Sequence, residues 1–140
     1  MPKQFKLDVI SLTHAAYSGN VTSVTVPGVD GELTILADHI PVITPLKAGE
    51  MITRRENETI FTAISSGFLI VDPGRVTVLA DSAEKLEDLD EEKINAAKAR
   101  AEKLLSEKKF ADDRSFADAT AALEKSLSHL RIIKKHRTRR

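Results

Sequence analysis

The chain opens with an alternation of apolar and polar positions. Phe5, Leu7 and Val9 alternate with Lys6 and Asp8, which is the two-residue period of a half-buried β-strand. Similar alternating or β-branched runs recur at 21–26, 60–64, 67–71 and 75–79. Many short strands at close spacing favour an antiparallel sandwich or barrel over a parallel sheet.

Turn signals separate these runs. Pro27-Gly28 ends the valine-rich run, and Asp72-Pro73-Gly74 stands between two apolar runs, which predicts a hairpin. All five prolines and all six glycines lie at or before Gly74. Because proline and glycine interrupt regular elements, the chain after Gly74 is free to form long helices.

The second half of the chain has the 3.6-residue period of helices. Asp88 followed by Glu91 fits a capping box at a helix start. Apolar positions then share one face at 94, 97, 101, 104 and 105, and again at 116, 119, 123, 127, 130 and 133. Phe110 to Asp113 is the predicted break, with Asp112 or Asp113 as N-cap. We expect two antiparallel helices of about 20 residues, each about 30 Å long.

The pattern therefore predicts an N-terminal antiparallel β-sandwich over residues 1–86 and a C-terminal antiparallel two-helix hairpin over residues 87–140. The helices are rich in alanine, which favours helix formation but offers little area to bury. A weakly docked helix pair would suit a conformational switch. A permanently packed hairpin is the alternative that these residues leave open.

Charge is balanced overall but unevenly distributed. The chain has 21 basic and 21 acidic residues in 140, which argues against a wholly basic nucleic-acid binder. Residues 1–84 carry 6 basic and 10 acidic side chains, whereas residues 114–140 carry 8 basic and 2 acidic ones. The basic tail, which we define as Arg131, Lys134, Lys135 and Arg137, predicts a docking surface for an acidic partner. A solvated terminus is the alternative.

Motifs that carry catalysis or metal binding are missing from the sequence. There is no cysteine, and none of the four histidines has metal-ligand spacing. The Gly28–Gly31 segment lacks the lysine of a phosphate-binding loop. We therefore expect no metal site and a protein that is not an enzyme. No apolar run approaches the roughly 20 residues that span a bilayer, so we expect no direct membrane insertion.

Four segments in order resemble one known family. They read VPGVDGELTILADHIP at 26–41, LKAG at 46–49, SGFL at 66–69 and TVLAD at 77–81. This arrangement resembles the epsilon subunits of F-type ATP synthases over essentially the whole chain. The competing interpretation is a β-sandwich adaptor whose basic helix binds nucleic acid or another acidic partner. The aromatic content of the chain is only 4%, which argues against nucleic-acid binding.

The resemblance implies a non-catalytic rotor subunit in the central stalk, without a required cofactor. Its expected partners are the gamma subunit, the ring of c subunits and, when the helices extend, the acidic region of a beta subunit. It implies that the subunit couples ion flow through the ring to ATP synthesis and that its helices inhibit ATP hydrolysis. The expected location is the cytoplasmic face of the bacterial plasma membrane, as a peripheral part of the complex, with no nucleic-acid partner.

The resemblance also assigns individual residues. Glu32 and His39 match residues in loops that face the c ring, and we expect their two turns to lie at one end of the sandwich. Some bacterial members bind ATP through an [I/L]-D-x-x-R-A motif. Here Leu89-Asp90 matches that motif, while Lys93 and Ile94 do not.

Lysine lacks the bidentate fork of arginine, so the match to the ATP motif is incomplete. Arg100 and Arg114 are further candidate contacts from the hairpin. A nucleotide site at these residues and a simple capped helix start at Asp90 both stay open.

Overall fold

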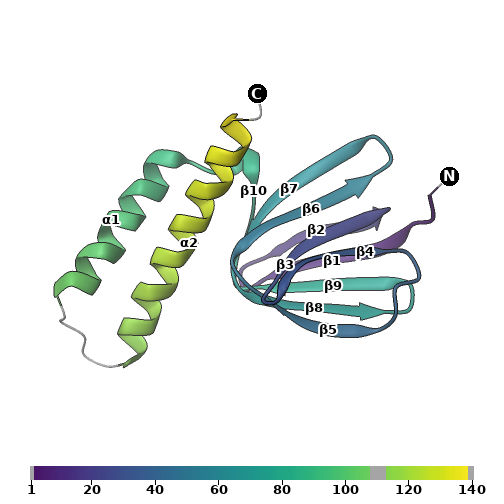
Figure 1. The fold of residues 1–140 in the computed structure, drawn as a ribbon, viewed down its shortest axis with the longest axis horizontal. Helices are drawn as coiled ribbons and strands as arrows, with labels where there is room; N and C mark the ends of the chain where they lie inside the picture. Colours follow the sequence, from purple (N-terminus) through teal and green to yellow (C-terminus); the bar gives the residue numbers. More distant parts are fainter. Residues whose placement is uncertain (1, 108–112, 139–140) are drawn as a thin grey trace. The chain divides into compact units, whose positions relative to one another are not determined.

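The computed structural model describes residues 2–107 and 113–138, and the chain divides into two compact units, Met1–Leu86 and Glu87–Arg140 (Figure 1). Each unit is treated by itself below. The first is built of strands and the second of helices, as the change of period at the middle of the sequence predicts.

Within the described residues the first unit contains ten strands. They are β1 (Phe5–Ser11), β2 (Ala15–Val21), β3 (Ser23–Gly28), β4 (Gly31–Leu36), β5 (Val42–Leu46), β6 (Gly49–Arg55), β7 (Glu58–Ile64), β8 (Gly67–Asp72), β9 (Arg75–Ala80) and β10 (Ala83–Lys85). A short 3₁₀ turn, η1 (Leu86–Asp88), leads to α1 (Glu91–Glu107) and α2 (Asp113–Thr138).

The strands form one sheet that folds over on itself. The hydrogen-bonded order is β10-β7-β6-β3-β5-β8-β9-β1-β2, with β4 paired to β3 outside this path. The β3–β5 ladder consists of the single pair Gly28↔Leu46, so the sheet bends there into two layers (Figure 1). Neighbouring strands are antiparallel except β1 and β9, which pair in parallel. The predicted antiparallel sandwich is thus confirmed, with one parallel pair.

The core lies between the two layers. Leu7, Val9 and Leu69 from one layer and Val24 and Met51 from the other are all at most 1% exposed and belong to one cluster. Alternate residues of a strand point to opposite faces, which is why the alternating runs bury one side. Burying each such side chain contributes about 1.5–3 kcal/mol.

The valine-rich run at 21–26 is divided between two strands, whereas its pattern predicts one strand. Val21 ends β2, whereas Val24 belongs to β3. Between them the Thr22 amide donates a 2.8 Å hydrogen bond to the Arg54 carbonyl of β6. The chain thus passes from one layer of the sandwich to the other within this β-branched run, and both valines are buried in the same core cluster.

The hairpin predicted at Asp72-Pro73-Gly74 is confirmed. Strands β8 and β9 pair from Asp72↔Arg75 to Gly67↔Ala80, and Gly74 has φ +74°, a left-handed conformation that glycine adopts without strain. Gly67 has a different reason to be glycine. A Cβ there would lie 1.9 Å from the Leu79 carbonyl oxygen, so no larger residue fits this close approach of two backbones.

The second unit is the predicted antiparallel hairpin, with a corrected helix start. Asp90, and not Asp88, caps α1: its Oδ1 accepts hydrogen bonds from the amides of Glu92 (3.1 Å) and Lys93 (3.3 Å). Asp88 lies instead in η1. Because two aspartates lie close to the helix start, the sequence allows either to be the N-cap, and only the backbone geometry selects one. Helix α2 begins at Asp113, while residues 108–112 of the predicted break, including the alternative cap Asp112, lie outside the described residues.

The predicted helix faces are only partly correct. Ile94, Ala101 and Ala119 are buried as expected, but Leu104 is 53% and Phe116 is 52% exposed. Buried positions that the apolar pattern missed are Ser126, Ser128, His129 and Ile132. Polar residues give no periodic apolar signal, so a face that buries serines and a histidine is invisible to such a pattern.

Candidate partner-binding surfaces

An apolar surface covers the outer face of strands β5, β8, β9 and β1. The register pairs Pro45 with Phe68, Phe68 with Leu79, and Leu79 with Ile10, so these residues form a row across four strands. Ile43 pairs with Ile70 in the adjacent row. Partly exposed members of this outer face are Ile43 (70%), Phe68 (51%), Ile10 (42%) and Leu79 (39%). Exposed apolar residues gathered on one face indicate a protein–protein contact.

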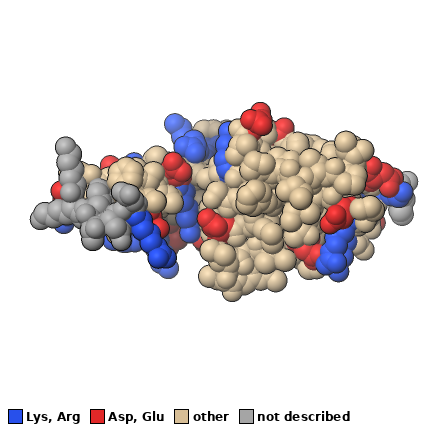
Figure 2. Space-filling view, turned by 90° about the horizontal axis from the view of Figure 1, so that it is seen from below, with Lys and Arg blue, Asp and Glu red and all other residues tan. Residues whose placement is uncertain are grey.

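A groove opens at one end of this outer face. Its volume is about 540 Å³, and Ile10, Leu12, Pro45, Phe68 and Leu79 supply its apolar lining. Leu12 is 81% exposed, and Ser66 and Asp81 add polar groups. In Figure 2, charged side chains lie mostly towards the margins of the visible part of the first unit. The groove is thus shaped for apolar side chains of a partner.

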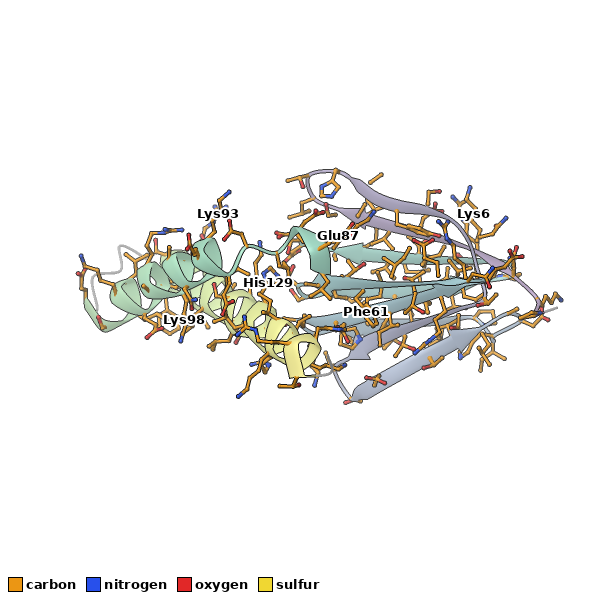
Figure 3. The ribbon with its side chains drawn as sticks, turned by 90° about the horizontal axis from the view of Figure 1, so that it is seen from above. Lys6, Phe61, Glu87, Lys93, Lys98 and His129 are labelled. Atoms are coloured by element: carbon orange, nitrogen blue, oxygen red, sulfur yellow. The ribbon has the colours of Figure 1, made fainter. Side chains whose placement is uncertain are left out.

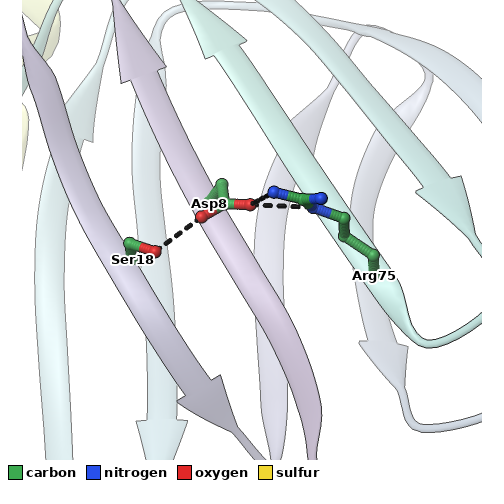
Figure 4. Close-up of polar contacts among 3 residues, drawn as sticks. All are labelled: Asp8, Ser18 and Arg75. Carbon is green, nitrogen blue, oxygen red and sulfur yellow. Dashed lines mark hydrogen bonds and ion pairs between the residues drawn. The ribbon is translucent and has the colours of Figure 1, made fainter.

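A charged network closes the other end of the outer face (Figure 4). Ser18 Oγ donates a 2.7 Å hydrogen bond to Asp8 Oδ1, and Arg75 Nε and Nη2 donate to Asp8 Oδ2 at 2.9 and 2.7 Å. The three residues join β2, β1 and β9. The pKa of the Asp8 carboxyl lies below its ordinary value. The hydrogen bond from Ser18 is the largest cause and those from Arg75 are the next, and together they outweigh the desolvation that raises the pKa. The network links three strands on the same face as the apolar surface, next to it.

Glu32 lies beside the tight turn between β3 and β4. Gly28 pairs with Gly31 and Pro27 with Glu32, and Gly31 has φ +131°, which favours glycine. The Glu32 side chain and its neighbour Asp30 are exposed. This turn therefore presents negative charge to solvent at the end of the sandwich where β3 finishes.

His39 lies in the loop between β4 and β5. Its amide donates to the Leu36 carbonyl at 3.3 Å, and its Nδ1 donates to the Ile40 carbonyl at 2.7 Å. The preceding Asp38 has φ +65°, and its carboxylate accepts hydrogen bonds from Lys3 Nζ at 2.7 and 3.0 Å. The loop is held in one shape by its own hydrogen bonds and leaves Ile40 75% exposed.

The expectation that Glu32 and His39 share one end of the sandwich is wrong. Glu32 is next to the turn at Gly28, whereas Leu36, three residues before His39, pairs with Ser23 at the opposite end of β3. The six residues of β4 span about 20 Å between these ends. The cause is the length of β4, since the sequence signature runs through a turn, a whole strand and the next loop.

The candidate nucleotide residues do not converge either. Lys93 lies in the first turn of α1, with its side chain extending away from the helix (Figure 3), and Arg100 is exposed two turns later. Arg114 lies in the first turn of α2, at the end of the antiparallel hairpin remote from Asp90. The 17 residues of α1 separate these ends by about 25 Å, so Asp90 and Arg114 cannot contact one small ligand in this closed hairpin.

The basic tail occupies the last two turns of α2. Arg131, Lys134 and Lys135 are exposed. Arg137 forms an ion pair with Glu91 at the start of α1. Cations are favoured near a helix C-terminus, so the charges also stabilise the helix that carries them. Among the residues that the structure describes, no group of three or more His, Asp or Glu side chains is arranged to hold a metal ion, and no helix is long and apolar enough to cross a membrane.

Comparison with known proteins decides the family. The model of the ATP synthase delta/epsilon chain β-sandwich domain matches residues 4–86. The ATP synthase epsilon chain of Dehalococcoides mccartyi is 37% identical over 134 residues, which cover 96% of this chain and 95% of that one. That of Bacillus velezensis is 36% identical, covering 93% and 97%.

The chain belongs to the ATP synthase delta/epsilon family. As an epsilon-type chain it has the role of a rotor-stalk subunit. A chain in the mitochondrial ATP synthase of Euglena gracilis, solved with OSCP, F1 and the c-ring, superimposes with a TM-score of 0.69 at 26% identity, covering 89% of this chain and 78% of that one. The central stalk and c-ring structure from Tetrahymena thermophila shares the fold, with a TM-score of 0.60 at 11% identity over 94% and 97% of the two chains.

Proposed function

We propose that this epsilon-type chain is a non-catalytic subunit that couples ion flow through a c ring to ATP synthesis. The observation that carries the proposal is the row of exposed apolar side chains from Pro45 across Phe68 and Leu79 to Ile10. Such a surface is costly in water and gains stability when a partner covers it. No cofactor is needed for this role. The chain is placed peripherally on the cytoplasmic face of a bacterial membrane, through its partners.

Different surfaces suit different partners. The apolar outer face with its groove fits the gamma subunit, because a permanent stalk contact buries a large apolar area. Ile43 lies on this outer face and Ile40 in the loop just before it, so the His39 loop belongs to the same contact. The negative Glu32 turn, at the other end of β4, is the contact for the c ring.

The basic tail of α2 supplies the regulatory function. Its exposed cations fit an acidic region of a beta subunit, which they reach when α2 leaves α1. Each exposed ion pair contributes only about 0–1 kcal/mol, so several act together. In that extended state the subunit inhibits ATP hydrolysis. The nucleic-acid adaptor remains the less favoured function, because the apolar outer face has no use in it.

The test compares two substitutions of similarly exposed apolar residues. Phe68→Asp places a charge in the centre of the outer face, whereas Leu104→Asp places one on α1, at 51% and 53% exposure respectively. Tagged variants are expressed in cells lacking the natural chain and purified from solubilised membranes. Phe68→Asp is expected to lower recovery of the other ATP synthase subunits at least tenfold, as truncated interface anchors do, and Leu104→Asp to leave it unchanged. Equal recovery, with both free chains folded by circular dichroism, would refute the assignment of the outer face.

A further inference from the structure

An ion pair closes the open end of the helical hairpin. Glu91 is the first residue of α1, and Arg137 lies in the last turn of α2. Arg137 Nη2 donates a charge-assisted hydrogen bond to Glu91 Oε2, although the two residues are 46 positions apart. The covalent connection between the helices is at the opposite end of the hairpin. A partner that pulls α2 away from α1 must therefore break this contact.

The Glu91 carboxylate is available for this contact because Asp90 already caps the helix. Asp90 accepts the hydrogen bonds of the Glu92 and Lys93 amides. Glu91 at a helix start and Arg137 at a helix end are each favoured by their own helix dipole. Both charges are therefore compatible with the closed hairpin and with separated helices.

Few apolar side chains of the hairpin are fully buried beside this contact. In α1 the buried residues are Ile94 and Ala101, and the buried apolar residues described in α2 are Ala119 and Ile132. Two alanines contribute little area, and the larger apolar side chains Leu105, Leu123, Leu127, Leu130 and Ile133 are only half-buried. The ion pair therefore adds to a modest apolar contact between the helices. Its side chains are 62% and 45% exposed, so the strength of the pair depends on ionic strength.

We propose that Glu91–Arg137 is an electrostatic latch that holds the hairpin closed and occupies one of the four cations of the basic tail. The inference rests on the proposed inhibitory function of that tail. The partner's carboxylates and Glu91 compete for the same guanidinium. Closing the latch weakens the tail as a ligand for an acidic surface, and docking of the tail on such a surface opens the latch.

The experiment measures the hairpin in the isolated full-length chain. The chain has no cysteine, so Asn95→Cys and Glu124→Cys, one exposed site on each helix, accept spin labels at two defined positions. Electron-electron double resonance then gives the ratio of separated to closed hairpins. Glu91→Gln is expected to raise this ratio about two- to fivefold at low salt, the range for an exposed ion pair, and wild type and variant should converge at about 1 M salt.

Glu92→Gln is the matched control, because it removes the same charge from the same helix turn without touching the latch. It is expected to leave the distances unchanged. The double variant Glu91→Arg with Arg137→Glu reverses the pair and should restore the closed population. The latch is wrong if Glu91→Gln and Glu92→Gln give the same distances, or if the reversed pair fails to restore them.

Activity of the assembled enzyme separates the latch from the proposed function. With the tail intact, Glu91→Gln should lower ATP hydrolysis by a similar two- to fivefold. Label distances that respond while removal of residues 131–140 leaves hydrolysis unchanged would retain the latch and refute the inhibitory tail. Hydrolysis that rises on removal of the tail, with distances insensitive to Glu91→Gln, would retain the tail and refute the latch.

Discussion

At the scale of single residues, the first unit depends on a few positions that apolar burial does not explain. Asp8 lies on the outer face of β1, yet it is only 9% exposed. It tolerates this because Ser18 and Arg75 satisfy both carboxylate oxygens. A buried carboxylate without such partners would lower the free energy of unfolding by several kcal/mol. An aspartate at position 8 therefore requires the hydrogen bonds from Ser18 and Arg75.

Replacing Asp8 tests this network. Asp8→Asn keeps an acceptor for Ser18 but loses the charge that Arg75 binds, and we expect the free energy of unfolding to fall by about 1–2 kcal/mol at pH 7. The folded pKa of Asp8 lies below its ordinary value, so its stabilisation is complete above about pH 4 and is lost as the pH falls through the folded pKa. The difference between wild type and variant should thus shrink in acid. Urea unfolding at several pH values measures it, with the exposed turn residue Asp30→Asn as control. A difference that stays constant down to pH 2 would contradict the assignment.

At the scale of elements, the two units differ in how much apolar surface they bury. All members of the apolar core cluster lie between Phe5 and Ala83, and among the described residues the sheet includes no strand outside Phe5–Lys85. The hairpin, in contrast, has few buried apolar residues on either helix. The sandwich therefore carries most of the hydrophobic stabilisation, and the helices are the weaker element.

A fragment of residues 1–86 should consequently fold alone. It retains the whole core cluster and every strand described. We expect a cooperative thermal transition and a dispersed NMR spectrum, whereas a fragment of residues 87–140 should melt broadly, since a short helix pair with little apolar burial is marginal in water. Absence of a transition in the 1–86 fragment would show that the sandwich requires the hairpin.

At the scale of the whole molecule, apolar and charged surfaces are separated along the chain. The first unit carries the apolar outer face and the second the basic tail. Apolar contacts are insensitive to salt, while exposed ionic contacts weaken as screening increases. Under the proposed function, the subunit attaches through the apolar outer face and is regulated through the basic tail.

Removing residues 131–140, or changing all four cations of the basic tail to alanine, should raise ATP hydrolysis by the assembled enzyme several-fold at low salt. Several exposed pairs of about 0–1 kcal/mol each are lost together. ATP synthesis should change less, because the apolar outer face still attaches the subunit. Hydrolysis measured over a salt series distinguishes lost charge from a destabilised hairpin: the wild type should approach the truncated form as salt rises. Equal rates at low salt would favour the solvated terminus.

The periods of the apolar pattern determined the fold class by themselves. A two-residue period requires strands, a 3.6-residue period requires helices, and the glycines and prolines mark where the first gives way to the second. The family signature likewise follows from the sequence, because it is a string of neighbouring residues. Local rules of this kind depend only on what stands nearby in the chain.

Only the tertiary structure decided which residues meet. It placed Glu32 and His39 at opposite ends of β4, selected Asp90 over Asp88 as the helix cap, and joined Glu91 to Arg137. It also gathered Ile10, Phe68 and Leu79 into one row. Such contacts depend on strand register and on pairing between distant segments. A one-residue change of register moves every side chain of a strand to the other face, and the periodicity of a single strand carries no information about its partner's register.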